Sequence, residues 1–284
     1  MNEFLSMLNP VAKWLHIIAG VMWIGLLYFF NFINGHVAAT MDSDTKKKVV
    51  PELMPRTLYW FRWGAAWTWF TGVVLLFVVY WYGNLGFAKE DVDGLLMGSP
   101  GNTMFDNGIL VDQWAHIMIL VTFVAVFLYD FLYKKVKFGI TCPVAKNTRV
   151  VTIVAFLLIA GIEYAMIHCG QFGYRAFNIH IGAMFGTMMA FNVWFRIWPA
   201  QQKIITAIKN GDAPNGDDVA LAGLRSKHNT YMSVPLIWTM INEHTTVFSG
   251  KLFDCSGLVL LIVIALGWHI VFQLYKKSGK IQGF

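Results

Sequence analysis

Apolar runs of membrane-crossing length dominate this sequence and restrict what it can fold into. A helix needs roughly 20 apolar residues to cross a bilayer, and about seven segments meet that requirement. The segments are 10–33, 60–82, 110–133, 148–169, 174–198, 231–249 and 256–275. Because a chain in hydrocarbon must satisfy its backbone hydrogen bonds internally, we predict an all-α, polytopic transmembrane helical bundle. We expect it to form a single membrane domain over residues 1–284.

The composition supports a membrane protein and argues against a nucleic-acid-binding one. Hydrophobic residues make up 57% of the chain, charged residues 13%, and the mean hydropathy is +0.54. A soluble domain cannot bury that share of apolar surface. The net charge of +6 does not indicate a nucleic-acid partner, because the basic residues fall in short connections between apolar runs. Two amphipathic stretches within 199–230, namely 199–211 and 217–230, are predicted to be interfacial helices.

Charged and aromatic residues predict the orientation in the bilayer. Lysine and arginine cluster in the first, third and fifth connections and at the C-terminus, whereas the second connection is acidic. The positive-inside rule then places the N-terminus outside and the C-terminus in the cytoplasm. Tryptophan and tyrosine lie near span ends, as in an interfacial aromatic belt; they are Trp14, Trp60, Trp63, Trp81, Tyr82 and Trp198.

Histidines recur inside the apolar runs, four of them at a similar estimated depth. His16, His116, His180 and His244 each lie roughly six residues, or about 9 Å at 1.5 Å per residue, from one end of a run. An ionisable side chain in hydrocarbon is a functional candidate, and neutral imidazole is the usual axial ligand of haem iron. We therefore predict that a pair of these residues binds haem b, with room for one or two haems. Towards the other side lie His36, His228 and His269, which are weaker candidates.

Each of these residues also has a structural interpretation. A buried histidine can simply be hydrogen-bonded, and Arg175 can either pair with haem propionates or extend to lipid headgroups. The small residues Gly20, Gly182 and Gly186 would admit a porphyrin ring, or else form a helix-packing face. Glu163 can relay protons or hydrogen-bond to a neighbour.

The spacing of the ligand-type residues disfavours other metal chemistry. No H-x-x-x-H and no C-x-x-C occurs, which argues against a non-haem metal site on one helix and against covalent c-type haem. Cys169 and Cys255 are both expected on the outer side, where they either form a disulfide or remain two free thiols.

Four long segments carry a family resemblance. They are WLHIIAGVMWIGLLYFFNF at 14–32, LYWFRWGAAWTWFTG at 58–72, HIGAMFGTMMAFNVWFRIWPAQQK at 180–203 and SKHNTYMSVPLIWTMINEH at 226–244. Through them the chain resembles the urate oxidase N-terminal domain family, the membrane domain of bacterial membrane-bound urate hydroxylases. The family's recurring histidines match His16, His180, His228 and His244, and the family also tends to place one in the last span, here His269.

The resemblance implies a multi-pass protein of the bacterial inner membrane that oxidises urate or a related reductant. The electrons would pass to a c-type cytochrome or a partner respiratory subunit. Family members that act on urate continue into a cytochrome c domain with C-x-x-C-H, which this sequence lacks, so a separate cytochrome c is expected to replace it. The alternatives are a haem b or structural subunit of a larger respiratory complex, and a non-redox transporter or assembly factor.

Overall fold

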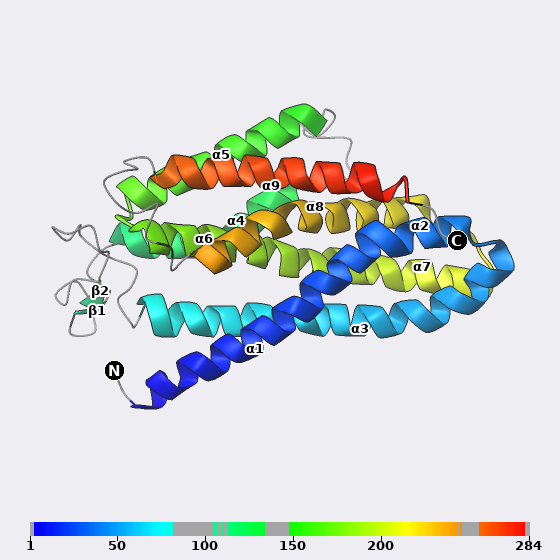
Figure 1. Cartoon of the computed structure of the whole chain (residues 1–284), viewed down its shortest axis with the longest axis horizontal. Helices are drawn as coiled ribbons and strands as arrows, with labels where there is room; N and C mark the ends of the chain where they lie inside the picture. The colour runs from blue at the N-terminus through cyan, green and yellow to red at the C-terminus, as the bar shows by residue number, and fades with distance from the viewer. Residues whose placement is uncertain are drawn as a thin grey trace. The chain divides into compact units, whose positions relative to one another are not determined.

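Helices make up nearly all of the computed structural model, which describes residues 3–81, 105–106, 109–110, 113–133, 148–242, 245 and 256–281 (Figure 1). The helices are α1 (Glu3–Tyr28), α2 (Gly35–Thr40), α3 (Ser43–Leu75), α4 (Gln113–Leu132), α5 (Thr148–His168), α6 (Tyr174–Asn192), α7 (Trp198–Asn210), α8 (Gly216–Ile241) and α9 (Ser256–Ser278). Three π-helical turns extend α1, α3 and α6, namely η1 (Phe29–Asn34), η2 (Leu76–Trp81) and η4 (Val193–Ile197). Two strands of two residues each, β1 (Phe105–Asp106) and β2 (Ile109–Leu110), pair antiparallel.

Contacts divide the chain into two compact units, and α6, α8 and α9 contribute to both. Unit 1 contains Met1–Leu75, Met189–Pro235 and Ile264–Phe284, and unit 2 contains Leu76–Met188 and Leu236–Val263. Whether the whole chain behaves as one domain stays a prediction.

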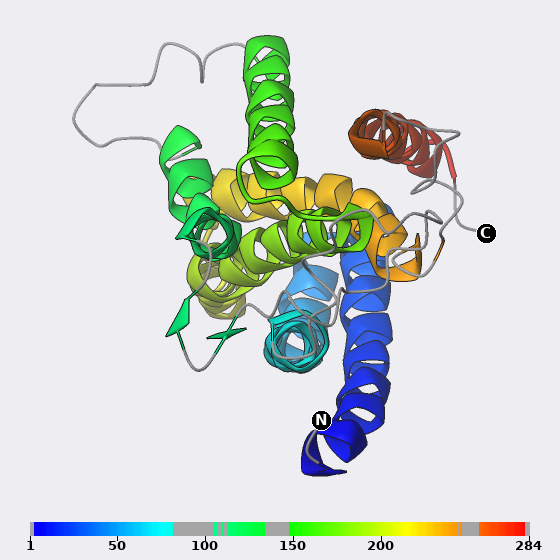
Figure 2. The same cartoon turned by 90° about the vertical axis from the view of Figure 1, so that its left-hand side faces the viewer.

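In unit 1, α1 crosses α3 obliquely, and the two helices pack closely (Figures 1 and 2). Gly64 of α3 permits this approach, because a Cβ atom there would lie 3.3 Å from Cβ and the backbone nitrogen of Trp23. Trp23 is itself 1% exposed. A Cβ atom at Gly20 of α1 would lie 3.7 Å from Cγ2 of Thr68 in α3. The small residues of this part of the chain therefore serve helix packing.

Side-chain and glycine caps explain where the helices of unit 1 begin and end. The Asp42 carboxylate accepts hydrogen bonds from the backbone N–H and the hydroxyl of Thr45, so it caps α3. Gly211 ends α7 in the left-handed region at φ 85°, where glycine carries no steric penalty. The Asn215 side chain accepts a bond from the Asp217 N–H at the start of α8.

The segment 217–230, expected to be an interfacial helix, forms the N-terminal half of α8. It continues without a break into the segment expected to begin at 231, and it carries buried polar residues. Its interfacial position stays a prediction. Arg225 is 1% exposed, and Asn229 is fully buried. Arg225 donates to Asn192 Oδ1 at 3.4 Å, while Asn192 donates to Asn229 Oδ1 at 2.8 Å. Amphipathic spacing suggested a surface helix here, but the polar face forms a core network.

Unit 2 is built around α6, the helix whose side chains are most enclosed. Residues 176–182 are all buried. Its Gly182 lies directly against Thr239 of α8, and Gly186 approaches Leu236. Gly182 and Gly186 thus serve helix packing in this structure. This agrees with the second interpretation given for them, a helix-packing face, and not with the admission of a porphyrin ring. The helices α4 and α5 also contact one another.

Among the residues that the structure describes, five helices have the length and apolar character to cross a membrane. They are Met7–Thr40, Ser43–Trp81, Trp114–Leu132, Arg149–His168 and Ser256–Ser278. Their exposed side chains include large apolar ones, such as Val21 at 70%, Phe127 at 63% and Leu157 at 62%, as a lipid-facing surface requires. This confirms a helical protein of membrane type. The expected spans 174–198 and 231–249 lie in the more polar and more buried α6 and α8. The count of seven and the orientation stay predictions.

Candidate functional site

His180 is the best-defined of the histidines expected to bind a cofactor. It lies in α6 and is 1% exposed. Its Nδ1 donates a hydrogen bond of 2.7 Å to the carbonyl of Ala176, one turn earlier, and its Nε2 accepts one of 3.1 Å from the Trp81 indole N–H. These roles select the tautomer that carries its hydrogen on Nδ1 and presents the Nε2 lone pair. Metal-ligating histidines are commonly oriented in the same way, by a bond from the other ring nitrogen.

Aromatic rings enclose the imidazole. The ring centroid of Phe172 lies 4.9 Å from that of His180, Tyr80 at 6.2 Å and Trp81 at 6.4 Å. Tyr80 and Trp81 come from the π-helical turn η2, and Phe172 comes from the turn between α5 and α6. An apolar wall of this kind excludes water, and burial is one of the means by which a protein sets a haem potential.

The first two turns of α6 also carry buried polar atoms without a hydrogen-bond partner in the described part of the chain. They are the Tyr174 hydroxyl and both amide atoms of Asn178. Tyr174 and Asn178 are four residues apart and so share one face of the helix, and the half-buried Arg175 lies between them in sequence. Buried polar groups are normally satisfied, so this face suits a ligand with its own polar groups.

The His180 imidazole is of a type that ligates haem iron, and its Nε2 accepts the Trp81 N–H in this structure. Tyr174 and Asn178 lie on a different face of α6 from His180, because residues two and six positions apart do not share a helix face. Sequence reasoning included Arg175 and His180 but missed Tyr174, Asn178 and Trp81. The four-residue spacing of Tyr174 and Asn178 was an available signal, whereas Trp81 was grouped with interfacial tryptophans because it ends a span.

His16 lies in unit 1 and has a hydrogen-bonded environment. Its Nδ1 is 3.1 Å from the Thr71 hydroxyl, and a Cβ at Gly72 would lie 3.0 Å from its Cε1. His16 thus packs into a groove that Gly72 leaves open on α3. Because this contact is made through Nδ1, Nε2 is the ring nitrogen through which His16 would bind a ligand.

The remaining candidates are spread over several helices. His116 is half-buried in α4, and His228 is half-buried in α8. His269 is exposed, with its Nε2 3.1 Å from the Gln273 amide nitrogen, and His36 is exposed beside Ser278. His244 and Cys255 lie outside the described residues, and Cys169 is an exposed free thiol.

No group of three or more His, Cys, Asp or Glu side chains in the described ranges is arranged to hold a metal ion. A haem needs only two axial ligands, and the pairing of the expected haem ligands stays a prediction.

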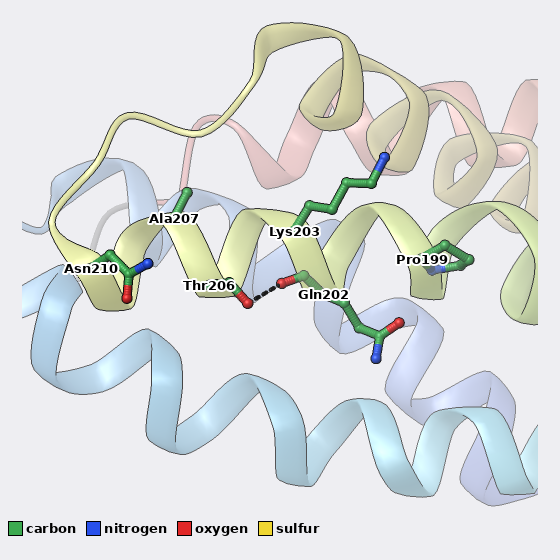
Figure 3. Close-up of a pocket in the computed structure, with 6 residues that line it drawn as sticks. All are labelled: Pro199, Gln202, Lys203, Thr206, Ala207 and Asn210. Atoms are coloured by element: carbon green, nitrogen blue, oxygen red, sulfur yellow. Dashed lines mark hydrogen bonds between the residues drawn. The ribbon is translucent and has the colours of Figure 1, made fainter.

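A surface hollow lies along α7 of unit 1. It measures about 630 Å³ and is lined by one face of α7, from Pro199 to Asn210 (Figure 3). Figure 3 also shows the bond of 2.8 Å from the Thr206 hydroxyl to the Gln202 carbonyl. Because a single helix lines it, this hollow is open surface and not an enclosed substrate cavity.

Long apolar helices of membrane-crossing length place the chain in the class of helical membrane proteins. The chain belongs to the urate oxidase N-terminal family, whose sequence model matches residues 40–282. This confirms the resemblance and relates the chain to urate-hydroxylase membrane proteins. The match includes α6 and α8 but begins after His16. None of the curated proteins and none of the solved structures compared with the chain matches it.

Proposed function

We propose that this protein is an integral-membrane b-type cytochrome of the urate oxidase N-terminal family. It would accept electrons from urate or a related donor and pass them to a c-type cytochrome or a partner respiratory subunit. The observation that carries the proposal is the hydrogen-bonding pattern of His180, whose Nδ1–H is fixed by Ala176 while Nε2 presents its lone pair inside an aromatic enclosure. Family membership supports urate as the first donor to test.

When bound, haem would supply reversible one-electron chemistry that side chains lack. His180 would hold the iron through Nε2, while the Ala176 carbonyl keeps the ring in the required tautomer. Arg175 would bind a propionate. Tyr80 and Phe172 would exclude water from the ligand.

Iron would compete with Trp81 for the same atom, because the Trp81 indole N–H donates to the Nε2 lone pair. Trp81 is the last residue of η2. A further histidine would complete the ligand set; the candidates from the sequence are His16, His116 and His244, with His228 and His269 as weaker ones.

The test is a dithionite-reduced minus oxidised spectrum of the purified protein, with a pyridine haemochrome to count haem per chain. We expect haem b in the wild type and in His36→Ala, because His36 is exposed and its ring contacts the Ser278 hydroxyl. We expect His180→Ala to lose it while still inserting into the membrane. Full haem occupancy in His180→Ala would refute His180 as a ligand.

The electron donor is tested by adding urate anaerobically to the oxidised protein. Reduction of haem by urate would establish a urate-oxidising enzyme. Reduction by dithionite alone, with co-purifying cytochromes, would indicate an electron-transfer subunit of a larger complex. A wild-type protein without haem would refute the cytochrome and leave the non-redox membrane protein.

A further inference from the structure

Glu163 is a buried carboxyl group in the C-terminal part of a membrane-type helix, five residues before the helix ends at His168. It lies in α5, within the candidate span Arg149–His168, and is 2% exposed. Neither of its carboxyl oxygens has a hydrogen-bond partner among the residues that the structure describes. An ionisable group in such a span is expensive to keep and therefore suggests a function.

The carboxyl group lies against the first turn of α9. A Cβ atom at Gly257, the second residue of that helix, would be 3.3 Å from Glu163 Oε1 and 3.0 Å from Ile167 Cδ1. Glycine at 257 thus provides the space that the carboxyl occupies. The N-terminal end of α9, which faces Glu163, has backbone N–H groups without a partner inside the helix. None of them donates a hydrogen bond to the Glu163 carboxyl group in this structure.

Glu163 forms no ion pair with any charged or titratable group that the structure describes nearby. The stretch of α9 that belongs to unit 2, residues 256–263, contains no charged or titratable residue. On α5 itself, the exposed Tyr164 and His168 rings lie on another face, with their centroids 4.2 Å apart and their planes tilted by 41°. The other described groups on the neighbouring helices are His116, Tyr129 and Asp130 of α4, Arg149 of α5, and Tyr174, Arg175 and His180 of α6.

An ionised carboxylate is very costly in such a place, whereas the protonated acid is not. Burial of an unpaired charge in a low-dielectric interior costs several kcal/mol or more, so the group binds a proton instead. A metal or alkali cation would need several oxygen ligands, and the described neighbours Gly257 and Ile167 offer no side-chain oxygen. The proton is the ligand that this surrounding accommodates.

We propose that Glu163 is a proton-binding site within the membrane, occupied while α5 and the first turn of α9 are packed together. The reaction is a simple acid–base one, in which the carboxylic acid releases a proton to water that reaches the α5–α9 contact and the carboxylate takes it back when the contact re-forms. No electron is transferred. The proposal does not depend on haem, so it can fail or succeed independently of the proposed function.

Infrared spectroscopy of the full-length protein in lipid tests this directly, because a protonated carboxyl has its own C=O stretching band. At pH 7 we expect such a band in the wild type, shifted in D₂O, and lost in Glu163→Gln, which has the same shape but cannot ionise. The matched control is Glu52→Gln, since Glu52 is exposed and paired with Arg56; this variant should keep the band. A wild-type band that survives unchanged in Glu163→Gln, or no band at all at pH 7, would overturn the proposal.

A second variant keeps the test decisive if Glu163→Gln does not fold. Glu163→Asp keeps a carboxylic acid but moves it away from Gly257, so the band should remain and change in frequency. An unchanged frequency in Glu163→Asp would assign the band to another group and refute the proposal.

Discussion

The Trp81 indole donates its hydrogen bond to Nε2 of His180, the ring nitrogen that we propose as an iron ligand. The two residues are 99 positions apart, and both belong to unit 2. A tryptophan thus occupies the coordination position of a histidine that is buried, oriented and surrounded by aromatic rings.

Removal of the indole N–H should favour haem binding. In Trp81→Phe the ring remains but the competing donor is lost, so we expect haem per chain to equal or exceed that of the wild type. The measurement is the pyridine haemochrome count on protein purified under identical conditions. If Trp81→Phe loses haem as fully as His180→Ala, Trp81 supports the site and does not compete for it.

The contact between Gly182 and Thr239 should tolerate no added methyl group. In Gly182→Ala the new Cβ would overlap the Thr239 side chain, and overpacking of a buried site costs about 1–3 kcal/mol. Gly186→Ala is the matched control, because its nearest neighbour is Leu236 Cδ1 at 3.9 Å. Thermal unfolding in detergent should show a lower midpoint for Gly182→Ala alone. Equal midpoints would mean that α6 and α8 are not packed through Gly182.

The buried amide network of unit 1 should contribute to stability. Asn229→Ala removes the acceptor of the Asn192 amide and the donor to the Met189 carbonyl. Loss of a partner for buried polar groups costs about 1–3 kcal/mol. We expect a lower unfolding midpoint than in Asn210→Ala, which changes an exposed asparagine of α7. If the two variants unfold together, the network does not stabilise the fold.

The start of α3 should depend on pH through Asp42. Hydrogen bonds from the hydroxyl and then the backbone N–H of Thr45 hold the pKa of the Asp42 carboxyl below its usual value. Because the folded pKa is lower than the unfolded one, the cap stabilises the helix start above the unfolded pKa of about 3.9. That stabilisation is lost as the pH falls through the folded pKa.

The amide-proton chemical shift of Thr45, followed by NMR between neutral and acid pH, measures this titration. Asp42→Asn provides the control, because asparagine also caps a helix but does not titrate. A Thr45 shift that titrates equally in both proteins would assign the effect to another group.

The sequence predicted the helical membrane fold because span length is a local property. Five of the expected segments overlap helices with membrane character, and His180 was already a candidate from its position in an apolar run. The tautomer of His180 could not be predicted, because it depends on Trp81 from a distant segment. The same holds for α8, whose polar N-terminal half suggested a surface helix until Arg225 and Asn229 were found buried.

The turn at Leu76–Trp81 is π-helical, and this winding determines which way Trp81 points. An α-helix advances by about 100° per residue, and a π-turn accommodates one residue more than the α-helical repeat, often beside a functional site. Deletion of a single residue before Trp81 within this turn would therefore turn the indole by about 100° around the helix axis, while Trp81 itself is kept. Such a variant would still have an indole N–H at Trp81, but the N–H would no longer point to His180 Nε2.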